Sequence, residues 1–147
     1  MARHRFTLVT SGLRYCSEML SAQDDFAIRA LYAAYNHAIH RGDAAAWAGC
    51  FTRSGRFSNR QRVVEGEVAL REYAADFSKD ENARYWVDNL ILEATDAGAS
   101  GTCYLMILHT GAEGGPPSVN LTGIYTDSLV LIEGKWRFSA RHIARDM

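Results

Sequence analysis

Apolar residues recur at helical spacing in residues 21–41, which gives the clearest periodic pattern of the chain. Ser21 and Asp24 can cap the first turn of such a helix. Gly42 is the type of residue that commonly follows a last helical turn. The apolar positions follow the i, i+3, i+4, i+7 rule of one helix face, namely Ile28, Leu31, Tyr32, Tyr35, Ala38 and Ile39. The pattern therefore predicts one long amphipathic helix.

Two shorter helices are predicted in the residues that follow. Asp43 is a favourable N-cap residue. The alanine-rich run after it carries Trp47 and Phe51 toward one side, which indicates a helix over residues 43–51. A third helix is indicated over residues 65–77, with apolar positions at Val68, Leu70, Tyr73 and Phe77. Helices therefore dominate the first half of the chain.

The second half changes period and is rich in β-branched and aromatic residues that alternate with polar ones. The alternating segments are residues 84–93, 101–110, 119–132 and 135–145. Turn-forming residues separate them and no helical segment intervenes, so the strands should pair mostly antiparallel. The sequence therefore predicts an α+β fold in which about three N-terminal helices pack on a strongly curved sheet.

Length and composition narrow the class of protein. The chain has 147 residues, 16 basic and 17 acidic side chains, a net charge of −1 and 48% hydrophobic residues, as in one globular domain. Near-neutral charge without a basic cluster argues against nucleic-acid binding. No apolar run approaches the ~20 residues of a membrane span. Cys16, Cys50 and Cys103 lie far apart and form no Cys-x-x-Cys motif, so we expect a reducing, cytoplasmic location.

Several short motifs together resemble the SnoaL-like branch of the nuclear transport factor 2-like superfamily. They are Asp25-Phe26-Ala27-Ile28-Arg29 through Tyr35, His40-Arg41-Gly42-Asp43, Trp47 to Phe51, Gly66 with Leu70, Arg84-Tyr85 with Asn89, Gly123-Ile124-Tyr125-Thr126-Asp127, and Gly134-Lys135-Trp136-Arg137-Phe138 with Arg141. The resemblance implies a cone of helices around a bent antiparallel sheet, an α+β barrel with a hydrophobic pocket at its wide end. It also implies a homodimer that forms through the open face of the sheet.

The same resemblance divides the chain into two parts. Relatives usually begin only a few residues before the first helix, where Met19 lies in this sequence. We therefore expect residues 1–22 to be an N-terminal extension without fixed structure. Alternatively, the chain starts at Met19, and residues 1–18 reflect only the choice of start site. Residues 23–147 are expected to form the single SnoaL-like domain.

The resemblance also points to residues that transfer protons. In relatives such as scytalone dehydratase and hexachlorocyclohexane dehydrochlorinase, an Asp at the end of the first helix orients a strand His that removes a proton. The matching positions here hold His40 and Tyr85, and a second strand His of scytalone dehydratase matches Tyr104. A phenol is mostly protonated at neutral pH, whereas imidazole can accept a proton. We therefore expect a His40–Tyr85 pair with roles exchanged relative to the relatives.

Ketosteroid isomerases of the superfamily indicate further site residues. Their carbonyl-polarising tyrosine aligns with Tyr35, whereas their catalytic Asp falls near Asn59, which cannot accept a proton. Arg141 aligns with an arginine of the dehydrochlorinase, and alternation places it on the face away from Phe138. We expect it to bind an anionic or carbonyl-bearing ligand. The predicted pocket lining comprises Tyr104, Met106, Leu121, Tyr125, Arg141 and Asn59.

Simpler interpretations of the same residues stay open. Tyr35 lies on the apolar stripe of its helix and is equally consistent with core packing. On an ideal helix His40 projects about 140° from Tyr35, toward solvent, and only the resemblance places it at the pocket. His37 and His40 have a metal-ligand spacing, but no carboxylate or cysteine lies at a matching offset, so no metal site is predicted. Arg141 is equally consistent with a salt bridge to a surface carboxylate.

Three functions are consistent with these features. The first is a cofactor-independent acid/base enzyme of the dehydratase, cyclase or isomerase type, acting on a small, apolar, carbonyl-bearing molecule through His40, Tyr85 and Tyr35. The second is a non-catalytic binding or accessory subunit, similar to the small subunits of ring-hydroxylating dioxygenases. The third is a self-associating structural domain with a vestigial pocket. We expect no cofactor and no nucleic-acid or membrane partner, but a small hydrophobic molecule and a second copy of the chain.

Overall fold

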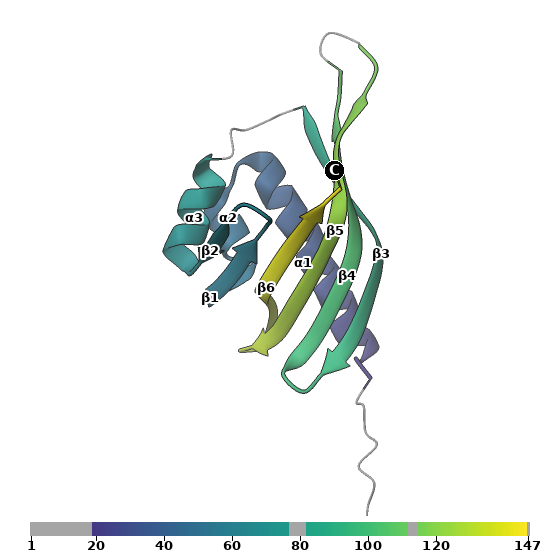
Figure 1. Ribbon diagram of the computed structural model, residues 1–147. Helices are drawn as coiled ribbons and strands as arrows, with labels where there is room; N and C mark the ends of the chain where they lie inside the picture. Colours follow the sequence, from purple (N-terminus) through teal and green to yellow (C-terminus); the bar gives the residue numbers. More distant parts are fainter. Residues whose placement is uncertain (1–18, 77–81, 112–114, 147) are drawn as a thin grey trace, which may run out of the picture.

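The computed structural model describes residues 19–76, 82–111 and 115–146 (Figure 1). Its helices are α1 (Ala22–Arg41), α2 (Ala44–Ala48) and α3 (Glu67–Asp76). Its strands are β1 (Phe51–Ser58), β2 (Val63–Glu65), β3 (Ala83–Thr95), β4 (Gly98–His109), β5 (Ser118–Ile132) and β6 (Lys135–Arg145). Of the expected N-terminal extension, residues 1–18 lie outside the described part of the chain.

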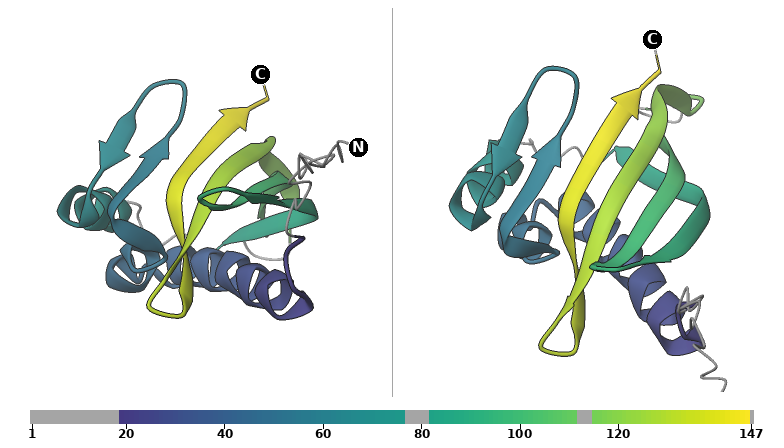
Figure 2. Two further views of the ribbon diagram at one scale, coloured as in Figure 1. Left: turned by 90° about the horizontal axis from the view of Figure 1, so that it is seen from below. Right: turned by 60° about the horizontal axis from the view of Figure 1, so that its bottom comes forward.

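The strands form one sheet in the order β2-β1-β6-β5-β4-β3. Neighbouring strands pair antiparallel except β1 and β6, which are parallel. The sheet bends around α1, which crosses its concave face, while α2 and α3 lie beside β1 and β2 (Figure 2). The predicted α+β class with a mostly antiparallel sheet is confirmed. The sheet is curved and open, however, rather than closed into a barrel.

The segment between the first and third helices differs from the sequence prediction. β1 and β2 lie within residues 51–65. The periodicity predicts that one helix ends at residue 51 and the next begins at residue 65, and it predicts no strand between them. The chain turns at Gly49, the C-cap of α2, so the helix ends at Ala48 instead of continuing over residues 43–51. Phe51 is therefore the first residue of β1 and enters the core from a strand.

Local chemistry at both ends fixes the length of α1. The Ser21 side chain accepts a hydrogen bond from the Asp24 backbone N–H at 3.0 Å and caps the first turn. Gly42 ends the helix with φ 66°, a left-handed conformation that glycine adopts without strain. One face of the helix packs on the sheet, and its buried residues are Ile28, Tyr32, Tyr35 and Ala38.

No helix in the described ranges is long and apolar enough to cross a bilayer.

Aromatic side chains fill the space between α1, α2 and the concave face of the sheet. Trp47, Phe51 and Phe138 are buried, and their ring centroids lie 5.3, 6.0 and 5.7 Å from that of Tyr35. Trp136 lies half-buried at the rim, where its indole N–H donates to the Asp24 carboxylate at 2.9 Å. The interior of the cone is therefore mainly packed core.

Two cysteines of this core provide a test of its packing. Burial raises the pKa of the Cys50 thiol to about 11 and that of Cys103 to about 12. Because the thiolate is the reactive form, we expect neither thiol of a Cys16→Ser variant to react with a chromogenic disulfide reagent at pH 8 while the chain is folded. Both should react once guanidinium unfolds it. Rapid reaction of either thiol without denaturant would show that the core is more accessible to solvent than the burial of these two residues indicates.

Candidate functional site

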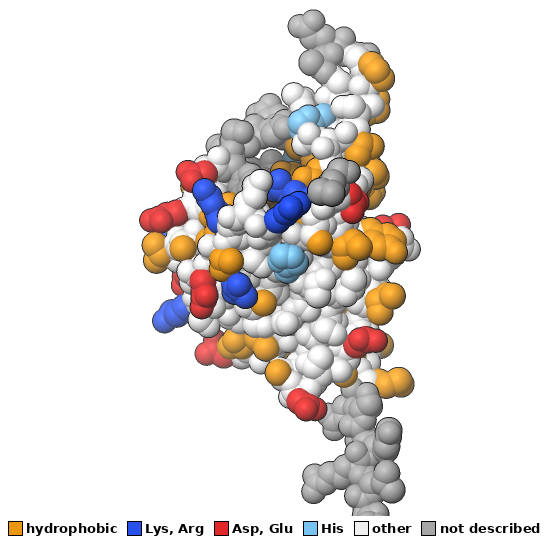
Figure 3. Space-filling model, in the orientation of Figure 1, with side chains coloured by type: hydrophobic (Ala, Val, Ile, Leu, Met, Phe, Trp, Pro, Cys, Tyr) orange, Lys and Arg blue, Asp and Glu red, His pale blue; other side chains and the backbone are white. Residues whose placement is uncertain are grey.

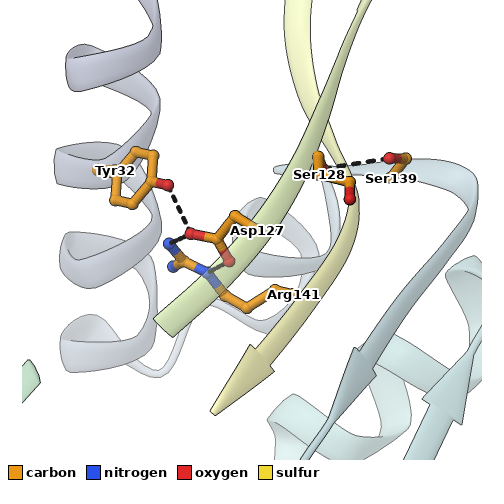
Figure 4. Close-up of polar contacts among 5 residues, drawn as sticks. All are labelled: Tyr32, Asp127, Ser128, Ser139 and Arg141. Atoms are coloured by element: carbon orange, nitrogen blue, oxygen red, sulfur yellow. Dashed lines mark hydrogen bonds and ion pairs between the residues drawn. The ribbon is translucent and has the colours of Figure 1, made fainter. Parts of the chain in front are cut away.

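A buried ion pair joins Asp127 on β5 to Arg141 on β6 (Figure 4). Arg141 Nε and Nη2 lie 2.8 and 2.7 Å from the two carboxylate oxygens of Asp127, which is a bidentate geometry. Neither side chain has exposed surface. The Tyr32 hydroxyl, on α1, donates a further hydrogen bond to Asp127. These contacts tie the long helix to two central strands.

Four aromatic rings surround the Arg141 guanidinium. Its Cζ atom lies between 4.0 and 4.6 Å from the ring centroids of Tyr32, Tyr35, Tyr125 and Phe138. At these distances aromatic faces attract a cation, which offsets part of the cost of removing the guanidinium from water. Burial lowers the pKa of Arg141, but the adjoining Asp127 carboxylate more than compensates and raises it well above the usual value. Arg141 therefore stays charged inside the core.

A β-bulge places Arg141 in the interior. The register between β5 and β6 shifts at Ser139, which has no residue opposite it on β5. Phe138 and Arg141 consequently point to the same face, not to the opposite faces that strict alternation predicts. The Ser139 hydroxyl donates to the Ser128 carbonyl oxygen at 3.1 Å beside the bulge (Figure 4).

Asp127 is the residue that sequence reasoning missed. It lies two positions after Tyr125 on β5, so alternation places both side chains on the inward face. A carboxylate on an inward face requires a cation partner, and that requirement was the available signal. Arg141 forms an ion pair in the core. It is therefore neither free to bind a ligand nor paired with a surface carboxylate, which were the two sequence interpretations.

Tyr35 and Tyr125 also belong to this core. They are 3% and 4% exposed, and their rings meet edge to face with centroids 6.2 Å apart. Burial raises the pKa of Tyr125 to about 12 and that of Tyr35 well above its usual value, and the positive charge of Arg141 opposes both shifts. Both phenols are therefore protonated at neutral pH, as the sequence interpretation expects of tyrosine.

A small cavity of about 60 Å³ remains inside the cone. The structure brings four of the predicted site residues to its wall: Tyr35, Tyr85, Leu121 and Tyr125. Pockets for small ligands usually span about 300–1,000 Å³. Core side chains therefore occupy most of the space expected for the hydrophobic pocket.

A larger groove of about 480 Å³ lies between α1 and the edge strand β3. Its wall includes His37 and His40 from the helix, and Arg84 and Tyr85 from the strand. The groove thus brings His40 and Tyr85 to one ligand-sized site, although the helix angle alone predicts that His40 points away. Tyr85 lines both the groove and the inner cavity.

Two polar atoms of residues in the groove wall are buried without a hydrogen-bond partner among the described residues. They are Asn36 Oδ1 and His40 Nδ1, about one helical turn apart on α1. Buried polar atoms are normally hydrogen-bonded, and an unmade bond costs about 1–3 kcal/mol. Hydrogen-bonding groups without a partner among the described residues therefore lie on two of the residues that line the groove.

Metal-binding side chains do not gather around this groove. His37 and His40 both line it, but the described ranges contain no group of three or more His, Cys, Asp or Glu side chains that could hold a metal ion. The chemistry that His40 and Tyr85 can perform there is hydrogen bonding and proton transfer.

Tyr104 and Met106 lie on the outer face of the sheet instead of in the predicted pocket. Cys103 and Leu105, which alternate with them on β4, are buried on the inner face. Tyr104 is 57% exposed. The convergence of Tyr104 and Met106 with Tyr85 therefore does not occur within one chain.

Asn59 lies in the turn between β1 and β2, outside the groove and the inner cavity. Its Oδ1 atom accepts hydrogen bonds from the backbone N–H groups of Gln61 and Arg62, each at 2.9 Å. This pattern is a turn held by an asparagine side chain. Asn59 therefore shapes the turn, and it borders a separate pocket near the end of β6.

The buried ion pair predicts a large difference between single and double substitutions. We expect Asp127→Leu to lower the free energy of unfolding by about 3–5 kcal/mol, because it leaves the Arg141 guanidinium buried and unpaired. The double variant Asp127→Leu/Arg141→Met removes both charges and should be more stable than Asp127→Leu alone. Urea unfolding followed by circular dichroism measures both effects.

The exposed pair of Asp25 with Arg29 on α1 provides the matched control. Its N–O distance is also 2.7 Å, but both side chains are largely in water. Asp25→Leu should therefore cost less than about 1 kcal/mol. If Asp127→Leu were no more destabilising than Asp25→Leu, the core would not depend on the buried pair.

The fold and the residue pattern agree with comparisons to known proteins. The SnoaL-like domain matches residues 21–142. No curated protein matches the chain in sequence. Among solved structures the chain is similar to Rv3472, a function unknown protein from Mycobacterium tuberculosis, with 31% identity over 84% of this chain and 72% of that chain and a TM-score of 0.77.

Two Streptomyces proteins have the same fold. Aln2 from a Streptomyces species is 26% identical over 88% of this chain and 95% of that chain, with a TM-score of 0.78. ActVI-ORFA from Streptomyces coelicolor is 22% identical over 83% and 96% of the two chains, with a TM-score of 0.76. Since the domain match covers most of the chain and the architecture is shared, this chain belongs to the SnoaL-like domain family of the nuclear transport factor 2-like superfamily.

Proposed function

We propose that the groove between α1 and β3 is the active site of a cofactor-independent acid/base enzyme that acts on a small, largely apolar, carbonyl-bearing molecule. The observation that carries this proposal is that His40 and Tyr85 line one groove of about 480 Å³. Buried polar atoms of Asn36 and His40 lack partners among the described residues there. The SnoaL-like family includes cyclases and dehydratases, which supports this class of reaction.

The two side chains divide the proton transfers. His40 acts as the general base and removes a proton from the carbon next to the carbonyl group. Tyr85, as a protonated phenol, donates a hydrogen bond to the carbonyl oxygen as negative charge develops on it. The resulting enolate expels a β-hydroxyl group as water with the proton held by His40, attacks a second carbonyl group, or regains the proton at another carbon. These three outcomes are dehydration, cyclisation and isomerisation.

The remaining groove wall indicates the kind of substrate. Asn36 Oδ1 is an acceptor, so it suits a substrate hydroxyl group. Apolar side chains from both elements, including Ala33, Val87 and Leu90, provide contacts for an apolar body. A small hydroxylated ketone with a hydrophobic ring system has these features.

A non-catalytic binding or accessory subunit, such as a dioxygenase small-subunit-like protein, is the second candidate. The inner cavity of about 60 Å³ favours it, because the space expected for a family-type pocket is filled by the core. The resemblance also places His40 and Tyr85 where relatives carry an Asp–His dyad, which agrees with a loss of catalysis. The carboxylate of Asp127 does not take over as a base, since it is held by Arg141 and Tyr32.

We further propose that the partner of this chain is a second copy that covers the outer face of the sheet. Tyr104 and Ile124 are paired neighbours on β4 and β5 and are 57% and 38% exposed. Met106 lies on the same face, opposite the exposed Trp86 on β3. Hydrophobic side chains gather on this face over β3 and β4 (Figure 3). A contiguous apolar patch of this kind marks an interaction surface, and identical patches can meet around a two-fold axis.

Substitutions in the groove test the catalytic proposal. We expect His40→Gln and Tyr85→Phe each to slow, by about 100-fold or more, the exchange of hydrogen for deuterium next to the carbonyl group of 2-tetralone. Proton abstraction is common to all three reaction types, so the assay requires no knowledge of the product. Proton NMR in deuterium oxide measures the exchange against the uncatalysed rate.

His142→Gln is the matched control for these variants. His142 lies on the outer face, where its Nδ1 atom is 2.9 Å from the Ser58 hydroxyl, so this variant should keep the wild-type rate. If the rates of His40→Gln and Tyr85→Phe both equal that of the wild type, the assigned roles are wrong. Exchange at only the uncatalysed rate with the wild-type chain would favour the accessory-subunit function.

Substitutions on the outer face test the proposed dimer. We expect Tyr104→Arg/Ile124→Arg to convert a dimer to a monomer, because the change places four like charges at a two-fold interface. Light scattering after size-exclusion chromatography measures the mass. Val68→Arg, at an exposed apolar position on α3, is the control and should leave the dimer intact. A wild-type chain that elutes as a monomer would overturn the proposal.

A further inference from the structure

A second ligand-sized pocket, of about 380 Å³, lies at the end of the molecule where β6 ends. Three elements form it: the β1–β2 turn, the end of α3 and the end of β6. Its wall consists of Asn59, Gln61, Arg62, Tyr73, Asp76 and Arg145. Basic side chains gather in this part of the surface (Figure 3). Within the described ranges, the pocket and the groove at His40 share no lining residue and form two separate sites.

Two arginines from different elements converge in this pocket on Tyr73. The Arg62 guanidinium carbon lies 5.4 Å from the centroid of the Tyr73 ring. Burial raises the pKa of the Tyr73 phenol, and the charges of Arg145 and Arg62 oppose that rise, as expected if both cations lie near the hydroxyl. Within the described ranges, neither arginine has a carboxylate within 4.0 Å, although Asp76 borders the same pocket.

The charges and the neighbouring rings define what would fit. Among the described lining residues, two arginines and one aspartate leave a single net positive charge, which matches a monoanion better than a doubly charged phosphate. The planar fork of a guanidinium matches the two oxygens of a carboxylate. Tyr73 packs on Phe57 and Trp47, with centroids 5.4 and 6.1 Å apart, so one wall of the pocket is the edge of the aromatic core.

We propose that this pocket binds the carboxylate group of a small organic acid, with Arg62 and Arg145 holding the carboxylate and the Tyr73 ring contacting the apolar body. Tyr73 and Arg145 also line the inner cavity, so the acid lies directly beside the core. The site does not depend on the chemistry at His40, and its occupant is either a separate regulatory molecule or an acid carried by the domain.

Titration with benzoate by isothermal calorimetry, at low ionic strength, tests this proposal. The wild-type chain should bind benzoate but not benzamide, which has the same ring without the charge. Arg62→Gln and Arg145→Gln should each weaken benzoate binding about tenfold or more, because each removes a charge-assisted hydrogen bond. Both side chains are exposed, so the variants should keep the wild-type circular dichroism spectrum.

Arg53→Gln is the matched control. It makes the same change in charge at a side chain that is 93% exposed and lies outside the pocket, so benzoate binding should be unchanged. Equal weakening in all three variants would show only a general effect of charge and would overturn the proposal. Equal affinity for benzamide, or tighter binding of inorganic phosphate than of benzoate, would overturn it as well.

Discussion

The bidentate ion pair between Asp127 and Arg141 constrains most of the structure around it. Either charge alone in the core would be strongly destabilising. The pair is tolerated because the bulge at Ser139 brings Arg141 to the inner face, the Tyr32 hydroxyl donates to Asp127, and four aromatic rings surround the guanidinium. The pairing of β5 with β6 and the position of α1 over the sheet are therefore set together, since a shift of either element would separate the partners.

The same constraint decides where proton chemistry can take place. Tyr35 and Tyr125 contact the Arg141 guanidinium, so the phenols that resemblance assigns to an inner pocket form the wall around a buried charge. Four buried polar atoms of the described residues lack a hydrogen-bond partner: Trp47 Nε1 and Arg141 Nη1 in the core, and Asn36 Oδ1 and His40 Nδ1 on residues that line the groove between α1 and β3. The reactive site proposed in the groove lies at the border of the core and leaves the ion pair intact.

Local and long-range effects explain how much of this could be predicted from sequence. α1 was predictable because its signals are local: Ser21 caps its first turn and Gly42 ends its last turn. β1 and β2 were not, since β1 is stabilised by pairing with β6, about 85 residues later, and tertiary contacts override weak propensity. The bulge at Ser139 leaves no periodic signal, so strict alternation wrongly places Arg141 and Phe138 on opposite faces of the sheet. His40 and Tyr85 could be placed at one site only through family resemblance, because the helix angle indicated otherwise.

Both proposed ligand sites lie near the two edges of the sheet. The groove is bordered by β3 and the arginine pocket by the β1–β2 turn, and β3 and β2 are the strands with only one neighbour. Side chains at an edge can be exchanged without repacking the close-packed interior, whereas a change near Arg141 disturbs several elements at once. The proposed use of His40 and Tyr85 at the positions where the resemblance places the relatives' Asp–His dyad would be such an exchange. On that proposal the group that gives and the group that takes the proton change places, which is one way in which a single fold can support different reactions.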